Sequence, residues 1–401
     1  MAKRKIQKPT RFERMYKVWD YLRKNTDRRH PTSIAKMRKD ENINAYIGDK
    51  ETINRLLKDM ANIMNLEDGG SDYKPEAEWR LYFDDFKKFY GDKERYERDD
   101  SDEDDSYIAN VMRIKNLYYN RTFSEKEVDS IIEGIMATRT LDSKSAQELV
   151  RKVEDNMTTA FYKRTPRHIC KVQEPELADR ELLKDNLAII QKAIDDNVRI
   201  QFRFNGYSYE KKLEPVREES DELSPYYIVA SGGKYYLLAA KEYEGYKPNM
   251  SIWRIDLMTD IEIPGRNDRL HIKGIPRIPK KNVSNLPEKW SEDFQLKHLN
   301  MSFDKPVPVT LRIKSEKCED NPKKRVRPGY TFLHDWFGDS FTYIRTEKEP
   351  PYDDIVRVEC SPYGMAHWAL QYSELVEVLE PESLREDIKN KIKALNEKYS
   401  L

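Results

Sequence analysis

The sequence is poor in the residues that form disulfides, bind metals or build nucleotide-binding loops. Its 401 residues include three cysteines, six histidines and 14 glycines. Cys170, Cys318 and Cys360 are far apart and form no CxxC pair, which excludes a disulfide framework and fits a reducing compartment. The histidines are equally scattered, so we expect no metal site. Because no glycine-rich phosphate loop, nucleophile elbow or matched carboxylate pair is present, we predict no catalytic residues, no cofactor and no enzyme.

Long apolar runs and a net charge are also missing. No stretch approaches the roughly 18 apolar residues of a membrane helix, and no apolar segment follows the basic start MAKRKIQK. We therefore expect no membrane span, no signal peptide and a cytoplasmic location. The 72 basic and 72 acidic residues cancel, so any attraction for nucleic acid has to be local.

The first 65 residues contain three segments with helical periodicity. HPTSIAKM predicts a short second helix, and Asp49 predicts the start of a third. Such helices joined by short turns are typical of a helix-turn-helix, and equally of a small bundle with charged outer faces. We expect the first helix to bury Phe12, Met15, Tyr16, Trp19 and Leu22, and the third to bury Ile53, Leu56, Leu57, Met60, Ile63 and Met64.

The outer face of the third helix is the candidate DNA-reading surface. In a helix-turn-helix, the N-terminal part of this helix enters the major groove. Cationic, hydroxyl and amide side chains there reach phosphates and base edges, and the basic arm Lys3 to Lys8 adds phosphate contacts. The predicted DNA-binding residues are Lys50, Thr52, Asn54, Arg55 and Lys58.

An acidic run, ERYERDDSDEDD at 94–105, follows this module. It cannot bury apolar area, so we expect a mobile loop directed away from DNA, with autoinhibition as the alternative. Further on, Ser124 and Glu127 form a capping-box pattern that opens two amphipathic helices. The stretch SPYYIVASGGKYYLLAA then predicts a hairpin turning at Gly232-Gly233, within a small bent sheet or barrel.

The parity of the hairpin raises the question of a binding face. Tyr235 and Tyr236 point to opposite faces, so one of them lies outside a single barrel interior. Arg203 and Arg254 each lie between bulky apolar neighbours and emerge opposite to them. Arginine and aromatic side chains on an exposed sheet face fit an anionic, planar ligand such as a nucleotide. Surface arginines over a tyrosine-rich core are the alternative.

Several stretches, in the order of one family, resemble a WYL-domain transcriptional regulator. LAIIQKAIDDNVRIQFRF, LSPYYIVASGGKYYLLAAKE and IWRIDLMTDIEI are similar to the WYL domain, with Tyr235-Tyr236-Leu237 at its Trp-Tyr-Leu triplet. DKETINRLLKDM resembles the family's winged helix-turn-helix, and FSEKEVDSIIEGIMATRTLDSKSAQELVRKVE its helical connector. The stretch from VTLRI to LNEKY resembles the C-terminal WCX-like extension.

The resemblance implies a homodimeric repressor that binds a double-stranded DNA operator and senses a nucleotide or single-stranded nucleic acid. Thr52 and Arg55 match the recognition-helix signature, but Leu56 stands where the family usually has Asp. In the sensor, Leu257 replaces a second arginine, which weakens a polyanion pocket unless Lys211, Lys212 or Arg217 compensates. The predicted ligand-binding residues are Arg203, Ser224, Tyr226, Tyr235, Tyr236 and Arg254.

The expected fold class is α+β and multidomain, with a small Sm/SH3-like barrel in its centre. A WYL accessory protein that binds single-stranded RNA or DNA beside a CRISPR or phage-defence system is the alternative function. The expected parts are a winged helix-turn-helix at 1–122 with an acidic insertion near 69–110, a helical connector at 123–182, a WYL domain at 183–266, a basic, proline-rich linker at 267–300 and a WCX-like dimerisation domain at 301–401.

Overall fold

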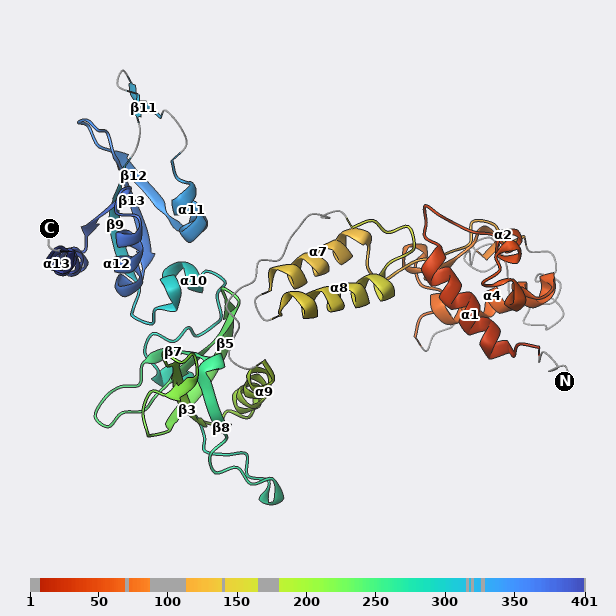
Figure 1. The fold of residues 1–401 in the computed structure, drawn as a ribbon, viewed down its shortest axis with the longest axis horizontal. Coiled ribbons are helices and arrows are strands. Elements are labelled where there is room, and N and C mark those ends of the chain that lie inside the picture. The colour runs from red at the N-terminus through yellow and green to blue at the C-terminus, as the bar shows by residue number, and fades with distance from the viewer. Residues whose placement is uncertain are drawn as a thin grey trace. The chain divides into compact units, whose positions relative to one another are not determined.

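The computed structural model describes residues 8–68, 72–86, 113–138, 141–164, 180–314, 317–318, 321–325 and 329–399 (Figure 1). The chain divides into two compact units, Met1–Glu174 and Pro175–Leu401. The first is mostly helical, and the second contains two larger β-sheets with helices, so the fold is mixed α and β and multidomain. The acidic run at 94–105 lies outside the described residues.

The N-terminal module is built around two capped helices. Thr10 and Glu13 form a capping box at the start of the first helix, and Asp49 caps the longest one by accepting from the Thr52 amide. Val18, Leu22, Ile53 and Leu57 lie in their shared core. The elements are α1 (Arg11–Asn25), α2 (Ile34–Lys39), α3 (Asn44–Ile47), α4 (Lys50–Asn65), η1 (Glu76–Glu78), β1 (Leu81–Tyr82) and β2 (Tyr118–Tyr119).

The strands β1 and β2 pair in antiparallel fashion and close one side of this core. Asn65, fully buried near the end of α4, donates to the Leu81 carbonyl and accepts from the Arg80 and Leu81 amides. Residues 72–86, expected within an insertion near 69–110, therefore belong to the packing of the module. Its buried core includes Trp79, Leu81, Phe83 and Phe86.

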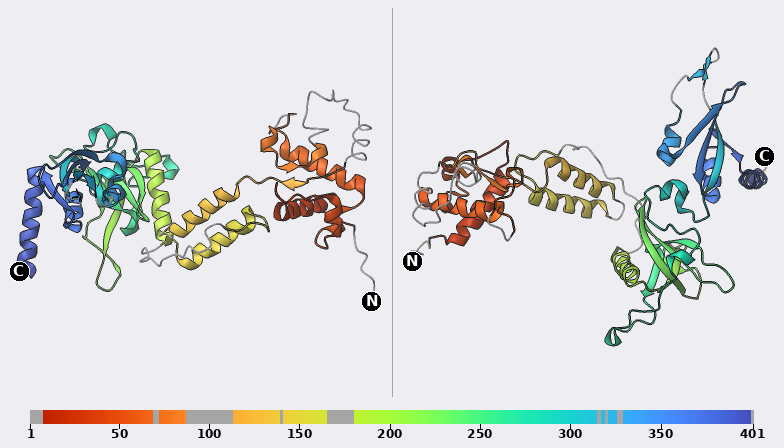
Figure 2. Two further views of the ribbon diagram at one scale, coloured as in Figure 1. Left: turned by 90° about the horizontal axis from the view of Figure 1, so that it is seen from above. Right: turned by 180° about the vertical axis from the view of Figure 1, so that it is seen from behind.

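Among the described residues, the first unit also contains α7 (Glu125–Ala137) and α8 (Ser143–Met157). They pack side by side around Val128, Ile132 and Val150 (Figure 2). As expected, Ser124 and Glu127 form a capping box. Arg121 joins this pair to the N-terminal module, because its guanidinium donates to the carbonyls of Thr26 (3.3 Å) and Thr158 (3.1 Å), the C-cap residues of α1 and α8.

The second unit begins with a helix packed on a curled sheet. Strand β3 pairs with β8 on one edge and with β5 and β4 on the other, and the order continues to β6 and β7. Ile190 of the helix packs with Phe202 and Leu237 of the sheet. The elements are α9 (Arg180–Asp196), β3 (Ile200–Tyr207), β4 (Leu213–Pro215), β5 (Asp221–Ser231), β6 (Lys234–Ala240), β7 (Met250–Arg254), η3 (Ile255–Leu257) and β8 (Met258–Glu262).

The other face of this sheet is covered by the chain's own residues 276–301. Phe294 and Met301 pack on Leu238, and Ile278 and Val283 pack on Ala240. The expected linker at 267–300 is thus largely bound to the sheet, because its apolar side chains cover a face that would otherwise be exposed. Residues 267–301 contain η4 (Asp268–Leu270), η5 (Lys280–Asn282), α10 (Phe294–Lys297) and η6 (Leu299–Met301).

The C-terminal part is an α+β layer around a four-stranded sheet in the order β12-β13-β9-β14. Trp368 is fully buried and contacts Phe337 and Tyr372. Strands β10 and β11 follow β9 in the sequence and form a separate antiparallel two-stranded sheet. The elements are β9 (Val307–Ile313), β10 (Lys317–Cys318), β11 (Asn321–Arg325), α11 (Thr331–Phe337), η7 (Gly338–Ser340), β12 (Thr342–Thr346), β13 (Asp354–Cys360), α12 (Pro362–Gln371), β14 (Val376–Glu380) and α13 (Glu382–Tyr399).

Candidate nucleic-acid interface

The N-terminal end of α4 presents three of the five predicted DNA-binding side chains. Lys50, Thr52 and Arg55 are exposed, and the helix begins at the cap formed by Asp49. The hydrogen bond from the Thr52 backbone amide is the main cause that lowers the pKa of Asp49. The carboxylate is thus occupied in fixing the first turn of the helix.

Asn54 and Lys58, also predicted to contact DNA, are buried. Asn54 is 0% exposed and Lys58 9%. They lie four residues apart on one side of α4, in line with Ala61 and Asn65, which are buried as well. Since Asn65 binds β1, this side of the helix faces β1 and not solvent. We therefore leave Asn54 and Lys58 out of the candidate interface.

Two arginines that the sequence analysis did not select lie near the same helix end. Arg38 of α2 donates to the Gly48 carbonyl (3.2 Å), and Arg14 of α1 donates to the Pro9 carbonyl (3.3 Å). Both cations act on the Asp49 carboxylate and contribute to its lowered pKa. With Lys50 and Arg55, they concentrate positive charge at a helix N-terminus, where anions are favoured.

Arg55 also has an acidic neighbour. Its guanidinium pairs with Glu51 one turn earlier, with 2.8 Å between Nη2 and Oε1. Both side chains are roughly half exposed, at 53% and 44%, and pairs of this kind contribute only about 0–1 kcal/mol. The pair can therefore exchange for a phosphate or a guanine edge at small cost.

The predicted ligand-binding residues of the central sheet do not form one cluster. Ser224 and Tyr226 are buried and hold the chain's own segment: Ser224 Oγ accepts from the Ile278 amide (3.0 Å), and the Tyr226 hydroxyl donates to the Ile278 carbonyl (2.7 Å). Arg203 is half exposed and lies 3.7 Å from Asp260. Ser224 and Tyr226 are thus both engaged at Ile278, and Arg203 lies beside Asp260.

The two central tyrosines lie on opposite faces of β6, as parity predicted. Tyr235 packs in the core shared with α9, and Tyr236 packs in the core covered by Phe294 and Met301. Tyr236 lies outside the core shared with α9, as expected for one of the two tyrosines. It enters a second core and not an exposed face, because this strand has a core on each side. Leu237 and Leu238 are accordingly both fully buried.

Arg254 has another predicted ligand-binding residue, Tyr236, as its neighbour. It lies directly across from Tyr236 in the β6–β7 register. Its guanidinium forms a double contact with the buried Asp256, at 3.1 and 2.5 Å. Burial disfavours the charged form of Arg254. The hydrogen bonds and the negative charge of Asp256, helped by Tyr236 and Tyr207, outweigh this effect and raise the pKa of the guanidinium. An anion at this site has to compete with Asp256.

Two of the three cations considered as replacements for the missing arginine, Arg217 and Lys212, are engaged too. Arg217 contacts Asp221 with two nitrogens, at 3.0 and 2.5 Å, and lies over the ring of Trp253. Lys212 pairs with Glu210 at 2.7 Å. Within the described part of the chain, no group of three acidic, histidine or cysteine side chains has a geometry for a metal ion. No helix there is long and apolar enough to cross a membrane.

The arrangement defines a mixed α and β protein with two units, a curled sheet in the second unit and an α+β domain at its C-terminal end. Within that last domain, residues 305–395 match the family described as the WCX domain. None of the curated proteins matches the chain.

Two solved structures resemble the chain weakly. One is proteasome accessory factor B/C (PafBC) of Arthrobacter aurescens, with 15% identity, a TM-score of 0.21, and coverage of 72% of this chain and 40% of that one. The other is described as a CRISPR Cas-related protein, with 13% identity, a TM-score of 0.30, and coverage of 76% and 75%. The chain thus spans less than half of the PafBC chain. At such TM-scores, neither likeness carries an argument.

Proposed function

We propose that this protein is a transcriptional regulator that binds duplex DNA through the N-terminal end of α4. The observation that carries the proposal is the exposure of Lys50, Thr52 and Arg55 on a capped helix whose other sides are anchored by α1 and β1. A rigid helix with a cationic first turn, followed by a two-stranded wing, fits the major groove. Arg14 and Arg38 serve as phosphate contacts beside it.

In this proposal the remaining parts couple DNA binding to a signal. The WCX domain contributes to pairing of two copies, and the cross-strand pair of Tyr236 on β6 and Arg254 on β7 receives a nucleotide or a nucleic-acid end. Binding there exchanges Asp256 for a ligand anion at Arg254. Repression results when the dimer occupies a promoter, and ligand shifts the pairing of the two DNA-reading modules.

The proposal is tested by fluorescence anisotropy on labelled duplexes from the region upstream of the protein's own gene, over a series of salt concentrations. We expect Arg55→Ala to weaken binding about tenfold or more and to lower the salt slope by about one, because one cationic contact is lost. Lys184→Ala is the matched control, since Lys184 is a 70% exposed cation on α9 in the other unit. Equal affinity of Arg55→Ala and the unmodified chain would count against the proposal.

A second candidate is a single-strand-binding accessory protein, favoured by the cross-strand pair of Tyr236 and Arg254 near Tyr207. An aromatic ring beside a guanidinium is the stacking arrangement that single strands use. Arg254→Ala separates the two candidates. It abolishes binding of single-stranded oligonucleotides under this reading, and leaves duplex affinity unchanged under the first.

A further inference from the structure

An exposed apolar surface lies where the first and fourth helices meet. Phe12, Tyr16 and Ile63 were all expected in the buried stripes, yet they are 77%, 51% and 71% exposed. Large apolar side chains grouped on a surface mark interaction sites more often than single exposed ones do. The three residues come from two helices that pack on each other, so their surface is held in a fixed shape.

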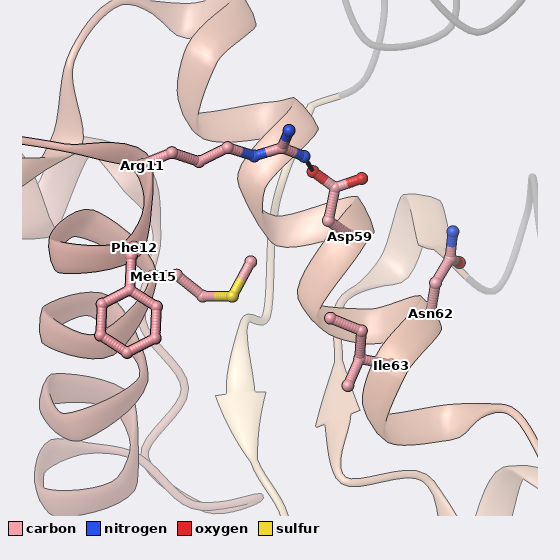
Figure 3. A pocket seen from close by; sticks show the side chains of 6 residues that line it. All are labelled: Arg11, Phe12, Met15, Asp59, Asn62 and Ile63. Atoms are coloured by element: carbon pink, nitrogen blue, oxygen red, sulfur yellow. Dashed lines mark hydrogen bonds and ion pairs between the residues drawn. The ribbon is translucent and has the colours of Figure 1, made fainter. Parts of the chain in front are cut away.

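A cavity of about 560 Å³ opens within this surface. Figure 3 shows Met15 of α1 and Ile63 of α4 directed toward each other across it, with the ring of Phe12 on the α1 side. Arg11 reaches across from α1 to an ion pair with Asp59 of α4. The surface therefore combines a protruding ring, an apolar hollow and one charge of each sign; the lining is Arg11, Phe12, Met15, Asp59, Asn62 and Ile63.

We propose that this surface binds the same surface of a second copy of the chain. In a two-fold contact every group meets its counterpart twice, so the patch has to be complementary to itself. Phe12 supplies a projection and the Met15–Ile63 hollow supplies its receptor. Arg11 and Asp59 supply opposite charges, which re-pair between the copies as Arg11 with the partner copy's carboxylate and the reverse.

The charges argue against nucleic acid as the occupant. Arg11, the one cation among the described residues that line the cavity, is balanced by the Asp59 carboxylate, and this acidic group repels phosphate. None of the exposed residues of the candidate DNA interface lines the cavity. A second copy can therefore occupy it while Lys50, Thr52 and Arg55 stay accessible. The inference goes beyond the proposed function and does not depend on DNA binding.

A contact as small as this one is more stable when a second contact holds the two chains together, since tethering raises the effective concentration of the partner copy. A mass measurement of the full chain alone cannot isolate it, because the pairing proposed above for the WCX domain would give the same mass. The test has to report on this surface directly. Disulfide crosslinking between two differently substituted full chains does so.

One chain carries Phe12→Cys and the other Ile63→Cys. Mixed under mild oxidation without DNA, they should yield at least about tenfold more crosslinked product than a mixture of Phe12→Cys with Leu149→Cys, whose position on α8 is 39% exposed. The native cysteines are present in both mixtures, so only the excess is scored. A yield no higher than that of the Leu149 control would overturn the proposal.

A charge exchange then separates pairing between copies from pairing within one chain. Arg11→Glu added to both cysteine chains places only carboxylates at the contact, and Asp59→Arg added to both places only cations there, so each lowers the yield. When one chain carries Arg11→Glu and the other Asp59→Arg, every contact between the copies joins opposite charges, and the yield returns. No recovery in this mixture contradicts the two-fold contact. Loss of duplex-DNA affinity in Phe12→Ala without any crosslink would instead identify nucleic acid as the occupant and overturn the proposal.

Discussion

The hydroxyl of Tyr226 donates a hydrogen bond to the carbonyl oxygen of Ile278 across 2.7 Å. Tyr226 is 2% exposed and Ile278 8%, so both groups are removed from water. The bond fixes the start of residues 276–301 on the sheet, together with the Ile278 amide on Ser224 and the guanidinium of Arg277 over the Tyr226 ring. A position that the sequence assigns to ligand binding is used to hold the fold.

Removing this hydroxyl should destabilise the second unit. We expect Tyr226→Phe to lower the free energy of unfolding by about 1–3 kcal/mol, because the Ile278 carbonyl is left buried without its donor. Denaturant unfolding followed by tryptophan fluorescence measures the change. Tyr246→Phe is the control, since Tyr246 is 78% exposed and removing its hydroxyl leaves no buried group without a partner. Equal loss in both variants would show that the buried bond is not the cause.

A glycine on α12 marks the closest approach of that helix to η6. A Cβ at Gly364 would lie 2.7 Å from the Leu299 carbonyl oxygen and 2.9 Å from the Leu299 Cβ. Because these atoms cannot yield without moving backbone, we expect Gly364→Ala to cost about 1–3 kcal/mol. Gly134 on α7 has no atom within 4 Å of the same position, and there the substitution should stabilise by about 0.5–1 kcal/mol. Thermal unfolding of both variants checks the opposite signs.

His298 should make the second unit sensitive to acid. Its ring is 5% exposed, stacks on Phe294 and contacts the Ser302 carbonyl at 2.7 Å. Burial is the main cause that lowers its pKa below the ordinary value of 6.5, and the Lys297 charge acts in the same direction, against Ser302 and Asp304. The unfolded chain then binds the proton more readily than the folded one.

The stability contributed by neutral His298 is thus complete above the unfolded pKa of about 6.5 and falls as the pH drops through the lowered folded value. We expect His298→Gln to flatten the dependence of the melting temperature on pH between about pH 7.5 and 5. The exposed His367, changed in the same way, should leave the curve as it is. A parallel shift of the whole curve in His298→Gln would mean a packing effect without titration.

Arg121 should control how firmly α7 and α8 are attached to the N-terminal module. Its guanidinium joins the C-cap carbonyls of α1 and α8, and burial lowers its pKa. In Arg121→Met the two negative helix ends lose their shared cation. We expect at least about tenfold faster amide exchange at Ala160, whose backbone N–H bonds the Lys24 carbonyl. Arg151→Met, at an exposed position of α8, is the control; unchanged exchange at Ala160 in Arg121→Met would contradict this role.

The local signals in the sequence predicted the helices of the first unit well. Asp49, Ser124 and Glu127 cap helices where their spacing predicts, because a cap depends on residues a few positions apart. Burial on α4 was predicted less well: Ile63 is exposed, and Asn54 and Lys58 are buried. Periodicity predicts a buried stripe but not its width, and here β1 packs on a second side of α4 and widens the buried part of the helix.

The candidate ligand site shows the same limit at longer range. Alternation along the hairpin correctly separates Tyr235 from Tyr236, since that is a property of one strand. It does not reveal that residues 276–301 return to cover Tyr226 and Ser224, because this contact joins positions more than fifty apart. Pairing of Arg254 with Asp256 was within reach of the sequence, as the two lie only two residues apart.

A strand with a core on each side makes β6 an internal partition between two hydrophobic compartments. One compartment is sealed by α9, and the other by Phe294, Met301 and their neighbours. A molecule that binds on the second side has to displace Phe294 and Met301 before it contacts Leu238. Its binding is therefore coupled to detachment of residues 276–301 from the sheet. The rate of proteolytic cleavage near Trp290, which is 43% exposed, should then rise with the fraction of chains that have a ligand bound on this side.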